Sequence, residues 1–292
     1  MNCPNCGVNN TDYLYKFTEF KTSDYDLRCT SLNYTKPNLI KCADCKLIYS
    51  ELYKIDFEKL YGDVIDHQYI ELIPYKKLYF TNTLKKIQKY LDKDKDVLEI
   101  GSYYGVFGSL LAPETKTYTG IELSSHAVDY AKKNYNLNVY KSTIEEYLHN
   151  IETVDVVLMS HVIEHLDDPF SNLKLISEKM NEKSTFIFST YNMDSLIAKI
   201  LGKNYHWILP MHKYYFTKNF LKKYMESIGL RLEETITDTH TTSLKYFFTK
   251  IQAILPFTKF FLNPLSKISF ISELNIKINL GDLDLYVFKK VS

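Results

Sequence analysis

The stretch Asp96–Ala112, DVLEIGSYYGVFGSLLA, holds three of the nine glycines in a chain of 292 residues. A short apolar run precedes the first glycine, and apolar residues at helical spacing surround the other two. Glycine tolerates a left-handed backbone and lets another group approach closely. The pattern therefore predicts a buried strand, a tight turn and a helix, an arrangement that commonly holds a nucleotide.

Downstream of this stretch the chain alternates short apolar runs with amphipathic segments. Strands are expected at 96–100, 117–122, 138–141, 154–160 and 184–190. Such alternation predicts an α/β fold with a mostly parallel sheet covered on both faces, whose ligands bind beyond the carboxyl ends of the strands. Upstream, apolar residues at helical steps between Ile73 and Leu91 predict a helix that leads into the first strand.

The composition is that of an ordinary globular protein, with 45% hydrophobic residues and a formal charge of +1. Only two of the 36 basic residues are arginine, Arg28 and Arg231. Few arginines and near-neutral charge argue against nucleic-acid binding, which favours a basic surface and guanidinium contacts. No secretory signal follows Met1 and no apolar run is long enough for a spanning helix, so we expect a cytoplasmic protein.

Two cysteine pairs stand near the start of the chain, Cys3-Pro-Asn-Cys6 and Cys42-Ala-Asp-Cys45. Each pair can form a tight knuckle, and four thiolates suit a structural Zn²⁺. Strands expected at 38–41 and 47–50 flank the second knuckle, so residues 1–50 are expected to form a zinc ribbon. Redox chemistry is the alternative for the four cysteines. The fifth, Cys29, is expected to be a plain buried or loop thiol.

The glycine spacing separates two classes of nucleotide-binding turn. A dinucleotide fingerprint requires G-x-G-x-x-G, whereas Gly101, Gly105 and Gly108 follow G-x-x-x-G-x-x-G. Glu122 ends the second expected strand, where a carboxylate can accept both hydroxyls of a ribose. The spacing favours the turn of methyltransferases over that of dehydrogenases. The alternative is a packing turn that binds no ligand.

Five segments resemble, in order, the motifs of class I S-adenosylmethionine-dependent methyltransferases. VLEIGSYYGVFGSLL is similar to the glycine loop under the methionine part of the cofactor, and GIELSSHAVDYAKKN to the segment whose acid binds the ribose. KSTIEEY resembles the segment that lines the adenine, VDVVLMSHVIEHLDDP the fourth strand and its loop, and STFIFSTYN the fifth strand. The resemblance covers roughly residues 75–235 and implies S-adenosylmethionine as the cofactor. The family often has glycine where Tyr103 stands.

The resemblance implies the following cofactor-binding residues: Glu99, Gly101, Ser102, Tyr103, Gly105, Glu122, Leu123, Thr143, Ile144 and Ser160.

In such a methyltransferase the segment His161-Val-Ile-Glu164-His165 faces the methyl group. His161 and His165 are candidate bases, because histidine titrates near neutral pH and a hydroxyl acceptor must lose a proton; Glu164 is the candidate orienting carboxylate. The alternative is that the Glu–His pair caps the next helix or bonds to backbone. A similar E-x-x-E-H loop holds magnesium in some RNA 3′-end methyltransferases, so a catalytic metal is another alternative, with histidine in place of the first glutamate.

A second polar and aromatic cluster, HWILPMHKYYFT, spans residues 206–217. It resembles a segment with tryptophan, proline, histidine, tyrosine and phenylalanine in the same order in methyltransferases of bacterial polysaccharide and secondary-metabolite gene clusters. Trp207, His212 and Tyr215 are therefore candidate contacts to a sugar-like substrate. The alternative is a packed loop before a helix that Thr217 caps.

The family's last helix and strands are expected at 218–228, 231–237 and 283–290, with the final strand antiparallel. Between the last two strands lies an insertion at about 240–280, rich in phenylalanine and lysine. We expect helices that pack on the domain or form a homodimer face, with contact between residues 244–278 and a membrane surface as the alternative. The expected organisation is a ribbon at 1–50, a helical linker or cap at 51–92 and a methyltransferase domain at 93–292.

The sequence thus predicts a Rossmann-like, S-adenosylmethionine-dependent methyltransferase with a small zinc ribbon. The expected reaction is O-methylation of a small polar metabolite, such as a sugar or nucleotide-sugar for surface polysaccharide biosynthesis. An RNA methyltransferase that binds RNA through the ribbon is the alternative, against which the scarcity of arginine argues. A non-enzymatic scaffold that keeps the cofactor fold is the other.

Overall fold

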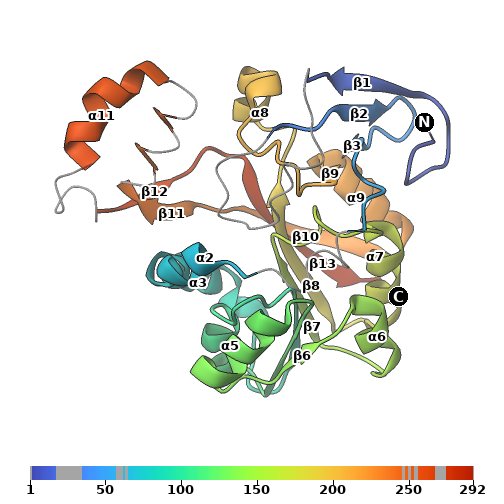
Figure 1. Ribbon diagram of the computed structural model, residues 1–292. Helices are drawn as coiled ribbons and strands as arrows, with labels where there is room; N and C mark the ends of the chain where they lie inside the picture. Colours follow the sequence, from blue (N-terminus) through green and yellow to red (C-terminus); the bar gives the residue numbers. More distant parts are fainter. Residues whose placement is uncertain are drawn as a thin grey trace.

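The computed structural model describes residues 2–17, 35–56, 62, 65–244, 247–248, 251–252, 256–266 and 274–291. A seven-stranded sheet in the order β10-β13-β8-β7-β4-β5-β6 forms its centre (Figure 1). Its strands are β4 (Asp96–Ile100), β5 (Thr117–Glu122), β6 (Val139–Lys141), β7 (Val156–Ser160), β8 (Thr185–Tyr191), β10 (Leu230–Thr237) and β13 (Leu283–Lys290). The pairs among β4 to β8 are parallel, and β13 runs antiparallel to β8 and β10. The predicted Rossmann-like sheet with an antiparallel last strand is confirmed.

Helices cover both faces of this sheet (Figure 1). One side carries α3 (Ile73–Ile87), α4 (Gly108–Leu111) and α5 (Ser125–Tyr135), and the other carries α6 (Ile144–His149), α7 (Pro169–Glu178) and α9 (Lys218–Ser227). Along β7, β8 and β13, apolar side chains alternate between two buried clusters, one for each helical layer. Burial on both faces explains why the strands could be recognised as continuous apolar runs.

Polar side chains begin the helices on both sides of the sheet. Ser124 caps α5, Thr143 forms a capping box with Glu146 at α6, and Thr217 caps α9 as the sequence predicts. Asp168 caps α7 by accepting from two backbone N–H groups. The helix after β7 is therefore capped by Asp168 and not by the Glu–His pair.

The N-terminal strands form a second sheet, which we call the ribbon sheet, in the order β1-β2-β3-β9. It contains β1 (Thr11–Tyr15), β2 (Leu39–Cys42), β3 (Ile48–Ser50) and β9 (Tyr214–Tyr215), all antiparallel. Its fourth strand comes from the second aromatic cluster of the sequence. Side chains of the ribbon sheet also share one buried cluster with α6, α7 and α9. The ribbon sheet is therefore joined to the part of the chain around the central sheet by the shared strand β9 and a shared core.

The remaining elements lie in the linker, after β8 and in the insertion. They are α2 (His67–Glu71), η2 (Gln88–Tyr90), η3 (Ala112–Glu114), α8 (Leu196–Leu201), η4 (Gly202–Asn204), β11 (His240–Ser243), η5 (Pro256–Thr258), α11 (Lys259–Ser266) and β12 (Asn275–Ile278). Among the residues that the structure describes, no helix combines the length and apolar character needed to cross a bilayer. Cys29 lies outside the described residues.

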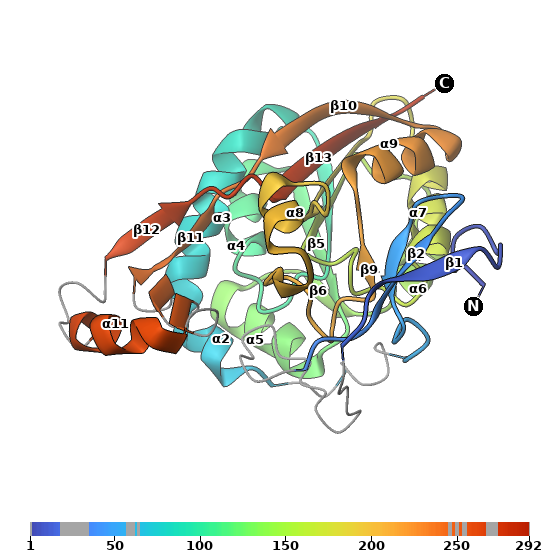
Figure 2. The ribbon, with the colours of Figure 1, turned by 90° about the horizontal axis from the view of Figure 1, so that it is seen from above.

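The insertion is helical only in part. Its two ends pair as the antiparallel strands β11 and β12, which carry α11 away from the central sheet (Figure 2). The sequence prediction missed these strands because the phenylalanine and lysine pattern between them suggested helices. On α11, Phe260 is 81% exposed and Phe261 is 66% exposed, so much of its apolar surface is uncovered by the described residues.

Candidate active site

In the glycine turn after β4, close packing leaves no room for a side chain at Gly101 or Gly105. A Cβ on Gly101 would lie 2.5 Å from Cγ2 of Val162, and one on Gly105 would lie 2.7 Å from Cβ of Ala131. Both glycines also have positive φ, +70° and +75°. The close approach that the sequence suggested is thus made by the chain itself. Because Val162 belongs to the loop after β7, the turn and the H-V-I-E-H loop are in direct contact.

Tyr103 has a left-handed backbone conformation, with φ +46°. Glycine would adopt this conformation without strain. Such a conformation costs a side-chain-bearing residue about 1–2 kcal/mol. Its ring packs edge-on against Tyr69 of α2 at 4.6 Å and against Tyr104 at 4.5 Å, and its hydroxyl donates to Asp66 at 3.4 Å. These contacts offset the strain and fix α2 of the linker over the turn.

Glu122 at the end of β5 is held by the turn. Its carboxylate accepts backbone N–H groups of Tyr103, Leu123 and Ser124, each at 2.9 Å. Burial raises the pKa of Glu122, and the three backbone donors oppose that shift. The carboxylate is therefore anchored where the sequence predicted the ribose-binding acid.

The other predicted cofactor residues lie along the same edge of the sheet. Ser102 is buried in the turn, Thr143 and Ile144 begin α6, and Ser160 ends β7 with its Oγ 3.4 Å from that of Ser189. Glu99 instead lies inside β4, where the buried Tyr118 hydroxyl donates to it. Ser102, Thr143 and Ser160 thus lie at or just after the ends of β4, β6 and β7, whereas Glu99 is enclosed by the sheet.

Because Glu99 is buried, the free energy of unfolding of the protein is expected to depend on pH. Burial, reinforced by the charge of Glu122, raises the pKa of Glu99 to about 8. The folded protein then holds this proton more tightly than the unfolded chain, whose glutamate pKa is about 4.3, so stability is expected to fall as pH rises from about 4.3 to 8. Glu99→Gln should lack this loss and be more stable than wild type at pH 8.5 by a few kcal/mol, at about 1.4 kcal/mol per pKa unit.

Urea unfolding at pH 5, 7 and 8.5 measures the effect of Glu99→Gln. Glu145→Gln, an exposed substitution at the surface of α6, is the matched control and should follow the wild-type pH curve. Parallel curves for wild type and Glu99→Gln would contradict the raised pKa.

Two predicted catalytic residues, Glu164 and His165, lie close to His212, a predicted substrate contact, beyond the ends of β7 and β8. One carboxylate oxygen of Glu164 and one imidazole nitrogen each of His165 and His212 lie within 4.8 Å of one another. Glu164 is 2% exposed and His212 is 3% exposed. The contact depends on the loop after β8, whose Lys213 and Tyr214 N–H groups donate to the Glu164 backbone carbonyl at 2.8 and 3.2 Å. We call these three residues the Glu–His–His cluster.

The histidines of this cluster are fixed in one tautomer. His165 Nδ1 lies 2.9 Å from the Met211 carbonyl oxygen, and His212 Nδ1 lies 2.9 Å from the Trp207 carbonyl oxygen. A carbonyl can only accept, so both Nδ1 atoms carry a hydrogen and each neutral ring keeps a lone pair on Nε2. Backbone bonds of this kind are what orient imidazoles for metal binding or for proton transfer.

The electrostatics of the cluster agree with these tautomers. Burial opposes ionisation of Glu164, but the imidazoles of His161, His165 and His212 outweigh it and lower its pKa to about 2. Burial lowers the pKa of His165, and burial together with His165 lowers the pKa of His212 to about 3. At neutral pH the cluster therefore presents one carboxylate and two neutral imidazoles, which can accept a proton or bind a divalent ion.

One oxygen of Glu164 has a partner and the other does not. Oε2 accepts from the Thr190 hydroxyl at 3.1 Å, whereas Oε1 is buried without a hydrogen bond from the described residues. Its neighbour is Nδ1 of His161 at 3.8 Å, which is equally buried and unpaired. A buried unpaired acceptor costs about 1–3 kcal/mol, so both atoms favour an additional polar group between or beside them.

Comparison with known proteins identifies the class of enzyme. A family model described as a methyltransferase domain matches residues 71–235. The chain belongs to this family. It is an S-adenosylmethionine-dependent methyltransferase, with S-adenosylmethionine as the methyl donor.

Among its relatives, this methyltransferase is 29% identical over 185 residues to a ubiquinone biosynthesis O-methyltransferase of Coxiella burnetii, with 58% of this chain and 79% of that protein covered. The protein of the same name from Escherichia coli is 24% identical over 160 residues, with 52% of this chain and 66% of that protein covered.

Solved structures show the same fold. A SAM-dependent methyltransferase from Archaeoglobus fulgidus has a TM-score of 0.52 at 22% identity and covers 77% of this chain and all of its own. A putative methyltransferase from Bacillus halodurans has a TM-score of 0.53 at 14% identity, covering 72% of this chain and 98% of its own.

The predicted substrate residues of the methyltransferase are not all placed together. Trp207 stacks on Tyr191 with ring centroids 4.0 Å apart, which covers one of its faces. The Tyr215 hydroxyl donates to the Leu209 carbonyl at 3.0 Å, and the residue is buried in β9 against the ribbon sheet. His212 alone joins the predicted catalytic residues. Tyr215 thus serves packing between the ribbon sheet and the methyltransferase part.

Two residues near the site were missed by the sequence prediction. The Tyr79 hydroxyl in α3 lies 3.1 Å from His161 Nε2, and Thr190 at the end of β8 donates to Glu164. Tyr79 is one of 25 tyrosines and belongs to no recognised motif, so nothing in the sequence singles it out. Thr190 belongs to the STFIFSTYN segment, whose position at the strand end was a usable signal.

The four N-terminal cysteines form a separate cluster. Sγ of Cys3 lies 3.5 Å from that of Cys45, and Sγ of Cys6 lies 3.7 Å from that of Cys42. All four sulfurs fall within 4.8 Å of one another. A tetrahedral ion with Zn–S bonds of about 2.3 Å separates its sulfurs by about 3.8 Å, close to this spacing, whereas a disulfide requires about 2.05 Å.

Proposed function

We propose that this methyltransferase transfers the methyl group of S-adenosylmethionine to a hydroxyl oxygen of a small polar molecule. The observation that carries the proposal is the convergence of the Glu–His–His cluster beside the glycine turn. The hydroxyl oxygen forms a bond to the methyl carbon, the sulfonium–carbon bond breaks to give S-adenosylhomocysteine, and the hydroxyl proton leaves to a base. The relatives named O-methyltransferases support oxygen as the acceptor atom.

In this proposal His165 is the base and Glu164 stabilises and orients it. The Nε2 lone pair of His165 is the proton acceptor, because Nδ1–H is committed to the Met211 carbonyl. The charge of Glu164 favours the protonated imidazole that the reaction produces. His212 provides a second lone pair, and His161 flanks Glu164 from the other side.

The same cluster fits a divalent metal ion. Glu164, His165 and His212 would hold it, and when bound it would lower the pKa of the acceptor hydroxyl. Two imidazoles and one carboxylate suit Zn²⁺ or Fe²⁺ better than Mg²⁺, which prefers oxygen ligands. The unpaired Oε1 of Glu164 supports an occupant of this kind.

The acceptor class rests on the aromatic cluster of residues 206–217. We propose a sugar-like or similarly polar ring near His212 and Trp207, whose ring stacks on Tyr191. The test is incubation with labelled S-adenosylmethionine and three fractions of the source cell: small molecules, lipids and RNA. Mass analysis should find the label in the small-molecule fraction on oxygen. Label in RNA alone would support the alternative that the sequence left open.

For the four cysteines we propose a structural Zn²⁺. The near-tetrahedral spacing of the sulfurs supports it, as does the fusion of the ribbon sheet to the core. Such an ion would replace missing apolar packing among the first residues of the chain.

The proposed ribose acid gives a direct binding prediction. Glu122→Gln should weaken S-adenosylmethionine binding at least about tenfold, because a hydrogen bond to a charged group contributes about 1.5–3 kcal/mol. Isothermal titration calorimetry measures the loss, with thermal unfolding to check that the turn still forms. Glu178→Gln, at an exposed position on α7, should bind like wild type. Equal affinity of Glu122→Gln and wild type would place the ribose elsewhere.

A further inference from the structure

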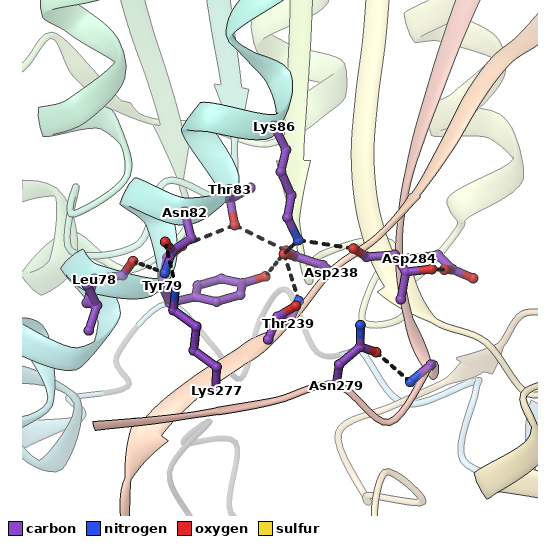
Figure 3. Close-up of polar contacts among 12 residues, drawn as sticks. Leu78, Tyr79, Asn82, Thr83, Lys86, Asp238, Thr239, Lys277, Asn279 and Asp284 are labelled. Atoms are coloured by element: carbon purple, nitrogen blue, oxygen red, sulfur yellow. Dashed lines mark hydrogen bonds and ion pairs between the residues drawn. The ribbon is translucent and has the colours of Figure 1, made fainter. Parts of the chain in front are cut away.

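A buried carboxylate lies behind the candidate active site, at the junction of β10 and the insertion. Asp238 is 2% exposed and accepts from the Tyr79 hydroxyl at 2.9 Å and the Thr83 hydroxyl at 3.1 Å through Oδ2 (Figure 3). Its Oδ1 accepts from the Lys86 ammonium at 2.7 Å and from the Thr239 backbone N–H at 2.8 Å. Three successive turns of α3 thus converge on one residue that follows β10.

This arrangement fixes the direction of the next hydrogen bond. A carboxylate paired with an ammonium is acceptor only, so the single hydroxyl hydrogen of Tyr79 points to Asp238. The Tyr79 oxygen then presents a lone pair to His161 Nε2, which lies 3.1 Å away. His161 must therefore donate Nε2–H to Tyr79.

The ring of His161 connects Tyr79 to Glu164 of the candidate active site. Nδ1 is turned toward Oε1 of Glu164, and both atoms are buried without a hydrogen-bond partner among the described residues. The backbone of His161 is left-handed, with φ +57°, a strained conformation that needs its surroundings to hold it. The bond to Tyr79 supplies one such contact.

We propose that Tyr79 and Asp238 are positioning residues for methyl transfer. Asp238 orients the Tyr79 hydroxyl, and Tyr79 keeps a hydrogen on Nε2 of His161 and holds its ring beside Glu164. The linker helix and the start of the insertion thereby take part in the active site without touching substrate. The expected effect on the rate rests on the proposed function, whereas the expected position of the hydrogen on His161 does not.

The test compares Tyr79→Phe with Thr83→Val. Tyr79→Phe keeps the ring and removes the hydroxyl, whereas Thr83→Val removes another donor to the same Asp238 oxygen without touching His161. Nitrogen-15 NMR of histidine-labelled protein reports the tautomer of His161, assigned with His161→Asn. The second readout is the initial rate of label transfer into the small-molecule fraction at saturating S-adenosylmethionine.

We expect Tyr79→Phe to lose full occupancy of the hydrogen on Nε2 of His161 and to transfer label about tenfold or more slowly, with an unchanged half-saturating S-adenosylmethionine concentration. Thr83→Val should retain both, and Asp238→Asn, whose amide oxygen still accepts from Tyr79, should be intermediate. A wild-type tautomer and rate in Tyr79→Phe would overturn the inference, as would equal losses in Thr83→Val. If Tyr79→Phe changes the His161 signal but the wild-type protein transfers label to none of the cell fractions, the positioning role of Tyr79 stands and hydroxyl methylation is refuted.

Discussion

Glu164→Gln is expected to lower the initial rate of methyl transfer by about two orders of magnitude or more, with little change in S-adenosylmethionine affinity. The substitution preserves shape and the acceptor for Thr190 but removes the charge that three imidazoles surround. Without that charge a protonated His165 loses its stabilising partner, and a bound metal ion loses its anionic ligand. Both versions of the proposed chemistry therefore require this carboxylate.

The measurement uses label transfer at saturating cofactor together with calorimetry for S-adenosylmethionine. Glu178→Gln, an exposed charge removal on α7, is the matched control and should keep the wild-type rate. A rate for Glu164→Gln within a few-fold of wild type would remove the Glu–His–His cluster from the mechanism.

Metal content separates the two versions of the chemistry. If the cluster holds an ion, Glu164→Gln and a His212→Gln variant should each lose one equivalent of metal while the cysteine cluster keeps its own. If His165 acts as a base without metal, the metal content should equal that of wild type. The comparison uses variants because a chelator would act on both candidate metal sites.

The central sheet was predictable because local signals and burial agree. The strands β4, β7 and β8 are largely apolar and buried on both faces. For all five strands from β4 to β8, the predicted ends lie within two residues of those observed. The helix starts were marked by short polar caps such as Thr217. Such features depend on residues close together in sequence, which is where pattern analysis is informative.

The missed features depend on partners far apart in sequence. β9 has only two residues, too few to show a period, and it becomes a strand because Tyr214 and Tyr215 pair with β3 of the ribbon sheet. His212 was assigned to substrate because nothing local shows that its loop folds over Glu164. Asp238 and Tyr79 are 159 residues apart, and their contact follows from the way α3 crosses the end of β10.

Loss of the proposed zinc should impair the active site as well as the ribbon sheet. Cys42 ends β2, and β3 next to it pairs with β9, directly after Lys213. The Lys213 and Tyr214 N–H groups hold the backbone carbonyl of Glu164. A continuous set of backbone hydrogen bonds therefore connects the cysteine cluster to the Glu–His–His cluster.

Cys42→Ser is accordingly expected to lose one equivalent of zinc, to lower the Tm by about 10 °C or more and to reduce methyl transfer in parallel. The serine hydroxyl is a poor zinc ligand, and the fully buried position offers it little water in exchange. Metal analysis, thermal unfolding and label transfer measure the three effects. Cys29→Ser, which changes the one cysteine outside the two pairs, should keep the zinc, the Tm and the rate. A Cys42→Ser protein that loses zinc but keeps the wild-type rate would show that the ribbon sheet does not hold the catalytic loop, since the backbone connection would then have no energetic consequence.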